Sequence, residues 1–197
     1  MRSRSMFRRC APLAVVLAGC ATHRFPPQTS SEVRRLGPEG SIEMTLTRGG
    51  RIAEVEFHVA PSALPSHVLR AMNEQFPGGE VTGAEVEYVA GVLHYEVTKR
   101  VEGRDMEVMF DEQGNPVRWE LEVEENRVPK AVLEAAMRAA PGTLRKVEEI
   151  RDADRRLVAY HVKKEDGGIR YKIEIAPEGR VVVVLREVPA EIEVPLE

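Results

Sequence analysis

The chain has 197 residues, a net charge of −4 at pH 7 and only two cysteines, both within the first twenty residues. An intramolecular disulfide is therefore not expected to stabilise the rest of the chain, so the fold must depend on apolar burial. Without residues 1–19 the chain carries 24 Lys and Arg against 32 Asp and Glu, a net charge of −8, which argues against binding to DNA, RNA or anionic lipid head groups.

Residues 1–19 have the pattern of an export signal. Four arginines precede the apolar run APLAVVLAG, which is too short to span a bilayer. The run ends in Leu17-Ala18-Gly19-Cys20, and this ending resembles the lipobox of bacterial lipoproteins. The resemblance implies that cleavage precedes Cys20 and that Cys20 is lipidated, so that acyl chains anchor the protein in the cell envelope. Ala21, where inner-membrane lipoproteins tend to have Asp, favours the outer membrane facing the periplasm.

Residues 20–61 are interpreted as a tether followed by a hairpin. Residues 20–40 are rich in Pro, Ser, Thr and Gly and show no hydrophobic period, so we expect a flexible tether that spans about 25 Å. Residues 41–61 alternate between polar and apolar residues on both sides of Arg48-Gly49-Gly50, which predicts a β-hairpin. This hairpin aligns with residues 106–123 and is interpreted as a partial copy of an internal repeat.

Residues 62–127 and 128–188 are interpreted as two full copies of that repeat. The segment that begins at Leu64-Pro65 is similar to the one at Val128-Pro129, and Tyr95-Glu96-Val97 is similar to Tyr160-His161-Val162. Each copy is expected to begin with a helix, because a proline in the first turn is followed by an apolar stripe at helical spacing and then by Pro-Gly. The rest of each copy alternates over four strands, which predicts an antiparallel sheet with one buried and one solvated face.

These elements predict an α+β fold of tandem helix-plus-four-stranded antiparallel sheet repeats, preceded by the β-hairpin and followed by a C-terminal tail of residues 189–197. The order of helix, Pro-Gly and four strands, with Tyr-x-Val in the second strand and Asp-x-x-Gly before the fourth, resembles the PepSY-like family of exported bacterial domains. The tandem arrangement also resembles the β-lactamase inhibitory protein fold. The resemblance implies a non-catalytic module that binds or inhibits proteins such as peptidases, and it transfers no binding residue.

The sequence offers no set of residues for catalysis, a cofactor or a metal ion. The five histidines form no metal-binding motif. His58 aligns with Glu122 and His161 with Glu96 of other copies, which is typical of a solvated sheet face. No serine lies in a nucleophile motif, and no free thiol remains after lipidation. We therefore predict no enzymatic activity, no cofactor and no metal.

The segment Val181–Leu185 departs from the alternation, because it is apolar on both faces. Its outward positions are assigned to Val181, Val183 and Leu185, which are the candidate binding residues. An apolar edge strand is a liability unless it is covered or paired. Either another element such as the tail 189–197 covers it, or it docks a partner by strand addition or by face contact.

The predicted function is that of a membrane-anchored, non-enzymatic binding module of the cell envelope, which binds or inhibits a protein or peptide through its sheet. The alternative is a structural accessory lipoprotein of outer-membrane or envelope assembly. The predicted partners are the membrane, through the lipid anchor, and an envelope protein or peptide. The sequence leaves the oligomeric state open.

Overall fold

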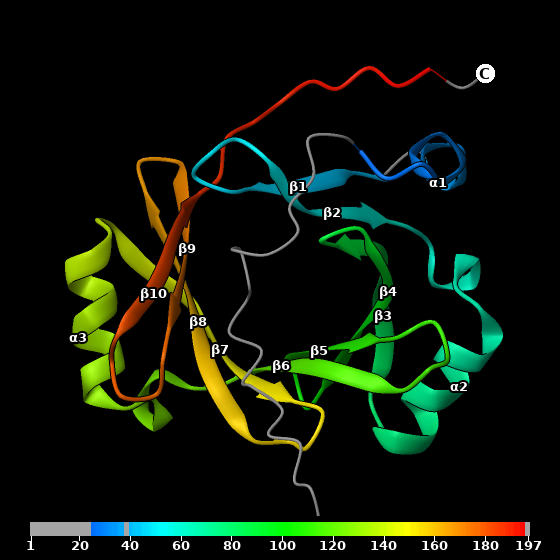
Figure 1. The fold of residues 1–197 in the computed structure, drawn as a ribbon. Helices are drawn as coiled ribbons and strands as arrows, with labels where there is room; N and C mark the ends of the chain where they lie inside the picture. The colour runs from blue at the N-terminus through cyan, green and yellow to red at the C-terminus, as the bar shows by residue number, and fades with distance from the viewer. Residues whose placement is uncertain (1–24, 38–39, 196–197) are drawn as a thin grey trace, which may run out of the picture.

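Ten strands dominate the fold (Figure 1). The computed structural model describes residues 25–37 and 40–195, so Cys20 and the predicted export signal lie outside the described residues. Each strand pairs antiparallel with the next one along the chain, which gives one continuous sheet with β1 and β10 at its edges. The strands are β1 (Ile42–Leu46), β2 (Ile52–His58), β3 (Glu80–Val89), β4 (Val92–Val101), β5 (Arg104–Phe110), β6 (Pro116–Glu122), β7 (Thr143–Asp152), β8 (Leu157–Asp166), β9 (Ile169–Ile175) and β10 (Val181–Arg186).

The predicted fold class, in which each tandem repeat has its own four-stranded sheet, is wrong. β6 pairs with β7, where Trp119 lies opposite Arg151, and β2 pairs with β3, where Phe57 lies opposite Val86. The sheet therefore continues from the N-terminal hairpin to β10. The alternation of polar and apolar residues predicts individual strands, but it contains no information on which strands are neighbours. Pairing across these junctions removes the exposed edges that separate sheets would leave.

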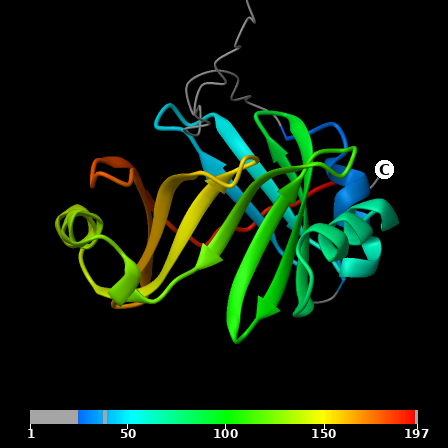
Figure 2. The same ribbon diagram turned by 90° about the horizontal axis from the view of Figure 1, so that it is seen from below.

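The sheet is curled into a half-barrel, and α2 and α3 lie on its convex side (Figures 1 and 2). In the described residues the helices are short: α1 (Thr29–Arg35), α2 (Ser66–Gln75) and α3 (Lys130–Ala139), with 3-10 turns η1 (Pro61–Ala63) and η2 (Glu125–Arg127) before α2 and α3. Pro65 and Pro129 occupy the N-cap positions of α2 and α3, at a helix end that needs no intrahelical N–H. None of the helices described is both long enough and apolar enough to cross a membrane.

Two apolar clusters lie between the helices and the convex face of the sheet. α2 contributes the fully buried Val68 and Met72 to the first cluster, and α3 contributes Val132 and Ala136 to the second. Full burial of a side chain such as Val68, Met72 or Val132 contributes about 1.5–3 kcal/mol to stability, so these contacts hold the helices on the sheet. The fully buried strand residues of the two clusters are Val55, Phe57, Val97, Val108, Phe110, Val162, Ile173 and Ile175.

A buried lysine stabilises the C-terminal end of each of the two longer helices. Lys99 Nζ on β4 donates to the carbonyl oxygens of Phe76 at 2.9 Å and Gly78 at 3.1 Å, just after α2. Lys164 Nζ on β8 donates to the carbonyl of Ala136 at 3.4 Å and to that of Ala140, at the end of α3. The last carbonyls of a helix have no intrahelical partner and attract cations. These lysines therefore supply hydrogen-bond donors to the carbonyls at the ends of α2 and α3.

Candidate functional site: a charged hollow in the sheet

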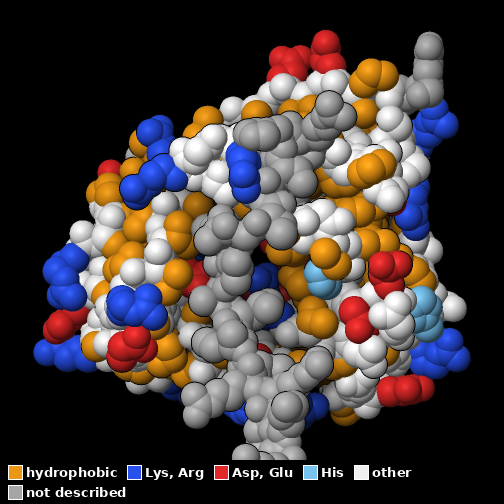
Figure 3. All heavy atoms as spheres, viewed as in Figure 1, with side chains coloured by type: hydrophobic (Ala, Val, Ile, Leu, Met, Phe, Trp, Pro, Cys, Tyr) orange, Lys and Arg blue, Asp and Glu red, His pale blue; other side chains and the backbone are white. Residues whose placement is uncertain are grey.

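The concave side of the sheet encloses a hollow of about 450 Å³. Figure 3 looks into it and shows acidic and basic side chains between the two halves of the sheet. This is the face that the sequence predicted as solvated, yet the exposed fractions of Glu96 and His161, which were assigned to it, are only 7% and 5%. Because the sheet curls, its far strands shield this face, which the alternation alone does not indicate. The acidic lining residues are Glu43, Glu56, Glu85, Glu87, Glu96, Glu107, Glu120, Glu165 and Glu187, and the basic ones include Arg118, Lys146, Lys163, Arg170 and Lys172.

Acidic and basic residues are unevenly distributed along the sheet. Residues 41–122, which contain β1–β6, hold 7 Lys and Arg against 15 Asp and Glu, a net charge of −8. Residues 143–186, which contain β7–β10, hold 11 Lys and Arg against 8 Asp and Glu, a net charge of +3. The curl brings the two ends together, so that Lys172 on β9 lies close enough to Glu54 on β2 to favour its charged form. The hollow thus has an acidic wall and a basic wall, and a partly enclosed space of this kind focuses their field.

The basic wall is internally compensated. Glu148 lies 2.6 Å from Lys146 Nζ and 3.1 Å from Lys163 Nζ. Glu120 lies 3.0 Å from His161 Nδ1 and 3.1 Å from a guanidinium nitrogen of Arg118. Burial opposes the charged form of His161, but the adjacent Glu120 outweighs it, so the pKa of His161 is raised. These ion pairs are buried and hydrogen-bonded, which is the condition under which charges are tolerated inside a protein.

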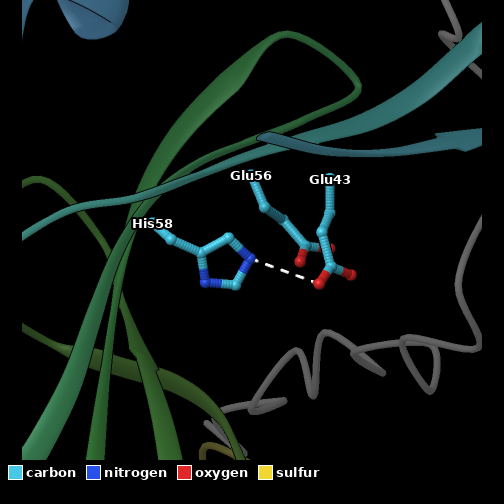
Figure 4. Close-up of side chains that lie close together, drawn as sticks. All are labelled: Glu43, Glu56 and His58. Atoms are coloured by element: carbon cyan, nitrogen blue, oxygen red, sulfur yellow. Dashed lines mark ion pairs between the residues drawn. The ribbon is translucent and has the colours of Figure 1, made fainter. Parts of the chain in front are cut away.

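On the acidic wall, Glu43, Glu56 and His58 lie close together (Figure 4). His58 Nε2 is 3.3 Å from Glu43 and His58 Nδ1 is 3.0 Å from Glu85. Hydrogen bonds to Glu43 and Glu85 raise the pKa of His58 to about 10 against the effect of burial. His58 is therefore an imidazolium at neutral pH, with both nitrogens protonated and no lone pair for a metal ion.

Glu54, Glu56 and Glu87 form a second group on the acidic wall, the acidic triad. Glu56 lies directly opposite Glu87 in the β2–β3 pair, and one carboxylate oxygen from each of the three lies within 4.8 Å of the others. Throughout residues 25–37 and 40–195, no Lys, Arg or His lies within 4.0 Å of these carboxylates. Like charges directly opposite in a sheet are destabilising, so the acidic triad needs protons or a cation.

Protonation is favoured at two members of the acidic triad. Burial, followed by the negative charge of Glu54, raises the pKa of Glu56 to about 8. Burial, with the adjacent Glu54, also raises the pKa of Glu87 well above its usual value. A hydrogen bond with Glu54 contributes to this shift, but the Oε2 atom of Glu87 has no hydrogen-bond partner in the described structure. An unpartnered buried carboxylate oxygen carries a large desolvation cost.

The three sequence-predicted binding residues lie on β10, the outermost strand, but they do not share one face. A bulge between Val181 and Val183 places Val181 opposite Ile175, on the helix side. Val183 lies opposite Glu174 and Leu185 opposite Lys172, on the concave side. One extra residue reverses the faces of the residues that follow. No sequence signal marks this bulge.

The C-terminal tail does not bury β10, although it was one of the elements expected to cover it. From β10 the tail runs past β1 to α1 (Figure 1), where Ser30 Oγ donates to the carbonyl of Pro195 at 2.8 Å. The exposed fractions are 38% for Val181, 36% for Val182 and 41% for Val184. A run of partly exposed valines therefore remains on the edge strand.

Sequence reasoning did not single out the acidic triad, since it treated glutamates at alternate strand positions as a solvated face. The difference in charge between residues 41–122 and 143–186 was readable from the sequence and was the one signal that pointed to a polarised site. Cys20, the predicted lipidation site, lies outside the described residues.

No family model and no curated protein matches the chain. The chain is similar to three solved structures from Bacteroides. A DUF2874 family protein from B. uniformis is 20% identical (TM-score 0.47; 62% of this chain, 89% of that chain). A protein from B. eggerthii that is described as periplasmic is 18% identical (TM-score 0.49; 62% and 88%). A BLIP-like protein from B. fragilis is 20% identical (TM-score 0.45; 66% and 93%). Likeness at this level does not extend to function, and the PepSY-like resemblance stays a prediction.

Proposed function

We propose that the protein is a non-enzymatic binding module of the cell envelope, anchored through a lipidated Cys20, and that it binds an extended segment of a partner protein along β10. The proposal rests on the position of β10 at the edge of the sheet together with the exposure of its valine side chains. It is the last strand of the sheet and pairs only with β9, and its valines are left partly exposed.

Strand addition is the binding mode that suits this edge. In the described residues no strand pairs with the outer side of β10, so its main-chain groups are available to an added strand. Main-chain hydrogen bonds would supply affinity, and side-chain contacts would supply specificity. Val184 lies opposite Ile173 on the helix side of the sheet, whereas Leu185 lies on the concave side. An added strand would therefore meet apolar surface on both faces.

The charge around β10 indicates the chemistry of the partner. The β7–β10 segment has a net charge of +3. Arg186, at the end of β10, is exposed and forms no ion pair with any described residue. Lys172 lies next to Leu185 in the β9–β10 pair. We therefore expect a partner segment in which apolar residues alternate with acidic ones, since opposite charges on neighbouring strands attract.

A peptide-display library tests the proposal on the purified protein. Wild type should enrich extended segments in which apolar and acidic residues alternate. Val184→Lys should reduce their binding at least about tenfold, since a charge on an edge strand blocks strand addition. Met137→Lys on α3, at a side chain that is 66% exposed, is the matched control and should bind like wild type. Both substitutions lie on the surface and should change stability by no more than about 0.5 kcal/mol.

Two results would argue against the proposal. Enrichment of the same segments by Val184→Lys would place the binding surface away from β10. Failure of wild type to enrich any segment would remove the support for peptide binding by this edge. The anchor is tested separately by the intact mass of protein from its own host, which should show an acylated N-terminal residue at position 20.

A further inference from the structure

We propose that Glu54, Glu56 and Glu87, the acidic triad, bind a divalent cation that prefers oxygen ligands, Ca²⁺ in the first place. This goes beyond the partner-binding role of β10 and does not depend on it. It also departs from the sequence prediction of no metal. The proposal rests on the geometry of three carboxylates and on a buried oxygen that has no partner.

The spacing of the three carboxylates suits Ca²⁺. One oxygen from each lies within 4.8 Å of the others. Ca²⁺ binds oxygen at about 2.3–2.6 Å, so it can bridge two ligand atoms that are up to about 4.6–5.2 Å apart, and every pair in the triad lies within that limit. Ca²⁺ accepts carboxylates in a flexible coordination shell, whereas Mg²⁺ demands near-ideal octahedral geometry and usually keeps several of its waters. A group of three carboxylates therefore favours Ca²⁺.

The buried Glu87 supplies an independent reason for a ligand. Its exposed fraction is 2%, and its Oε2 atom has no hydrogen-bond partner in the described residues although it lies on the wall of the hollow. Glu56 faces it directly from β2. A buried carboxyl group is expected to be protonated, paired or bound to a metal ion, and a metal ion would take the place of the proton that burial favours at Glu87. The hollow beside Glu56 and Glu87 provides room for the waters that complete the coordination shell of a hard cation.

The other two clusters of possible ligands are less suitable. Glu120, Glu148 and His161 lie within reach of one another, but Lys146 already lies 2.6 Å from Glu148 and Arg118 lies 3.1 Å from Glu120. The positively charged side chains of Lys146 and Arg118 repel a metal ion. The cluster of Glu43, Glu56 and His58 contains a protonated histidine, which offers no lone pair. Of these three clusters, only the acidic triad contains no histidine and has no Lys or Arg within 4.0 Å of its carboxyl groups.

The test is a calorimetric titration of Ca²⁺ into the purified full-length protein at pH 7.5 after treatment with EDTA. Wild type should bind one Ca²⁺ with a Kd of about 10⁻³ M or tighter, the range of extracellular calcium modules. Glu87→Gln should weaken binding at least about tenfold, because it removes a charged ligand. The matched control is Glu107→Gln, which removes a carboxylate from the same face two strands away on β5. It should stay within about twofold of wild type, because it is outside the coordination distance.

Two further measurements distinguish the loss of a cation ligand from the loss of the folded structure. Glu87→Gln should melt no lower than wild type in EDTA, since Gln mimics the protonated side chain that burial favours at this position. Binding to wild type should release protons, so the heat should depend on the ionisation enthalpy of the buffer. Glu54→Gln, as a second variant, should weaken binding in the same way.

Three results would overturn the proposal. The first is no saturable binding of Ca²⁺, Mg²⁺ or Mn²⁺ up to about 10 mM, tenfold above the weakest calcium modules. The second is unchanged affinity in Glu87→Gln, which would place the ion elsewhere. The third is equal weakening in Glu107→Gln, which would indicate only a diffuse attraction of cations to the acidic wall. Val184→Lys should bind Ca²⁺ like wild type, so the cation site and the proposed function of β10 can fail separately.

Discussion

Replacement of Glu56 by Gln should stabilise the metal-free protein at high pH, although it removes a charged residue. Burial and Glu54 raise the pKa of Glu56 to about 8 from an ordinary value of 4.5. The folded state therefore holds this proton more tightly than the unfolded state. The resulting stability is complete below pH 4.5 and is lost as the pH rises through about 8. Glutamine mimics the protonated side chain at every pH, so the variant should not show this loss.

The size of the effect follows from the two pKa values. At about 1.36 kcal/mol per pH unit, the change from 4.5 to about 8 corresponds to at most about 5 kcal/mol. Glu56 is partly exposed to solvent, and solvent weakens the electrostatic interactions within the acidic triad. We therefore expect a difference in the free energy of unfolding of about 2 kcal/mol. Wild type and variant should have equal free energies of unfolding at pH 4, and the variant should be more stable at pH 9.

The assay is urea unfolding in EDTA, followed by the fluorescence of Trp119, the single tryptophan. The difference in the free energy of unfolding between Glu56→Gln and wild type is measured from pH 4 to pH 9. A variant that is less stable than wild type at pH 9 would show that Glu56 is charged and favourably paired in the folded protein. That result would refute the description of the acidic triad as a group of carboxyls without a close cationic partner.

Three further predictions concern single side chains. Lys99→Met should lower the free energy of unfolding by about 1–3 kcal/mol, because the buried carbonyl of Phe76 and the partly buried carbonyl of Gly78 lose their donor. Lys130→Met, at a side chain that is 89% exposed, should change it by less than about 0.5 kcal/mol in the same urea assay. Glu148→Gln should destabilise the protein by about 2 kcal/mol at pH 7, because Lys146 and Lys163 lose their partner. The effect is smaller than for a fully buried ion pair, since both lysines are partly exposed. An unchanged melting curve would contradict this prediction. In an NMR titration His58 should stay protonated at pH 8, because its pKa is about 10. Burial lowers the pKa of His94, so the ring of His94 should be neutral at pH 8. A titration midpoint for His58 near pH 6.5 would rule out its ion pairs with Glu43 and Glu85.

The sequence predicted local structure better than it predicted the assembly of the sheet. Alternation placed Val55 and Phe57 on the buried face, where both have an exposed fraction of 0%, because a two-residue period fixes the side of a strand. Helical spacing likewise predicted the buried Val68 and Met72. These patterns depend only on neighbouring residues, so they are readable without knowledge of the fold.

Features that depend on distant strands could not be predicted in this way. The pairing of β6 with β7 and the curl of the sheet decide whether a polar face is open or enclosed. Glu96 and His161 therefore read as surface residues although their exposed fractions are only 7% and 5%. The contact from Lys99 to the end of α2 joins residues 23 positions apart, and no local pattern marks it. The bulge at Val182 likewise follows from the pairing of β10 with β9.

Photo-crosslinking in the native host tests the central claim most directly, namely that β10 receives an extended segment of a partner. A photoreactive amino acid is placed at position 184 on β10 and, as the matched control, at position 137 on α3, both at exposed side chains. The account predicts a discrete adduct from position 184 that is absent from position 137. It also predicts that a Val182→Lys substitution on the same strand abolishes this adduct. The absence of any adduct from position 184, or an equal adduct from position 137, would contradict it.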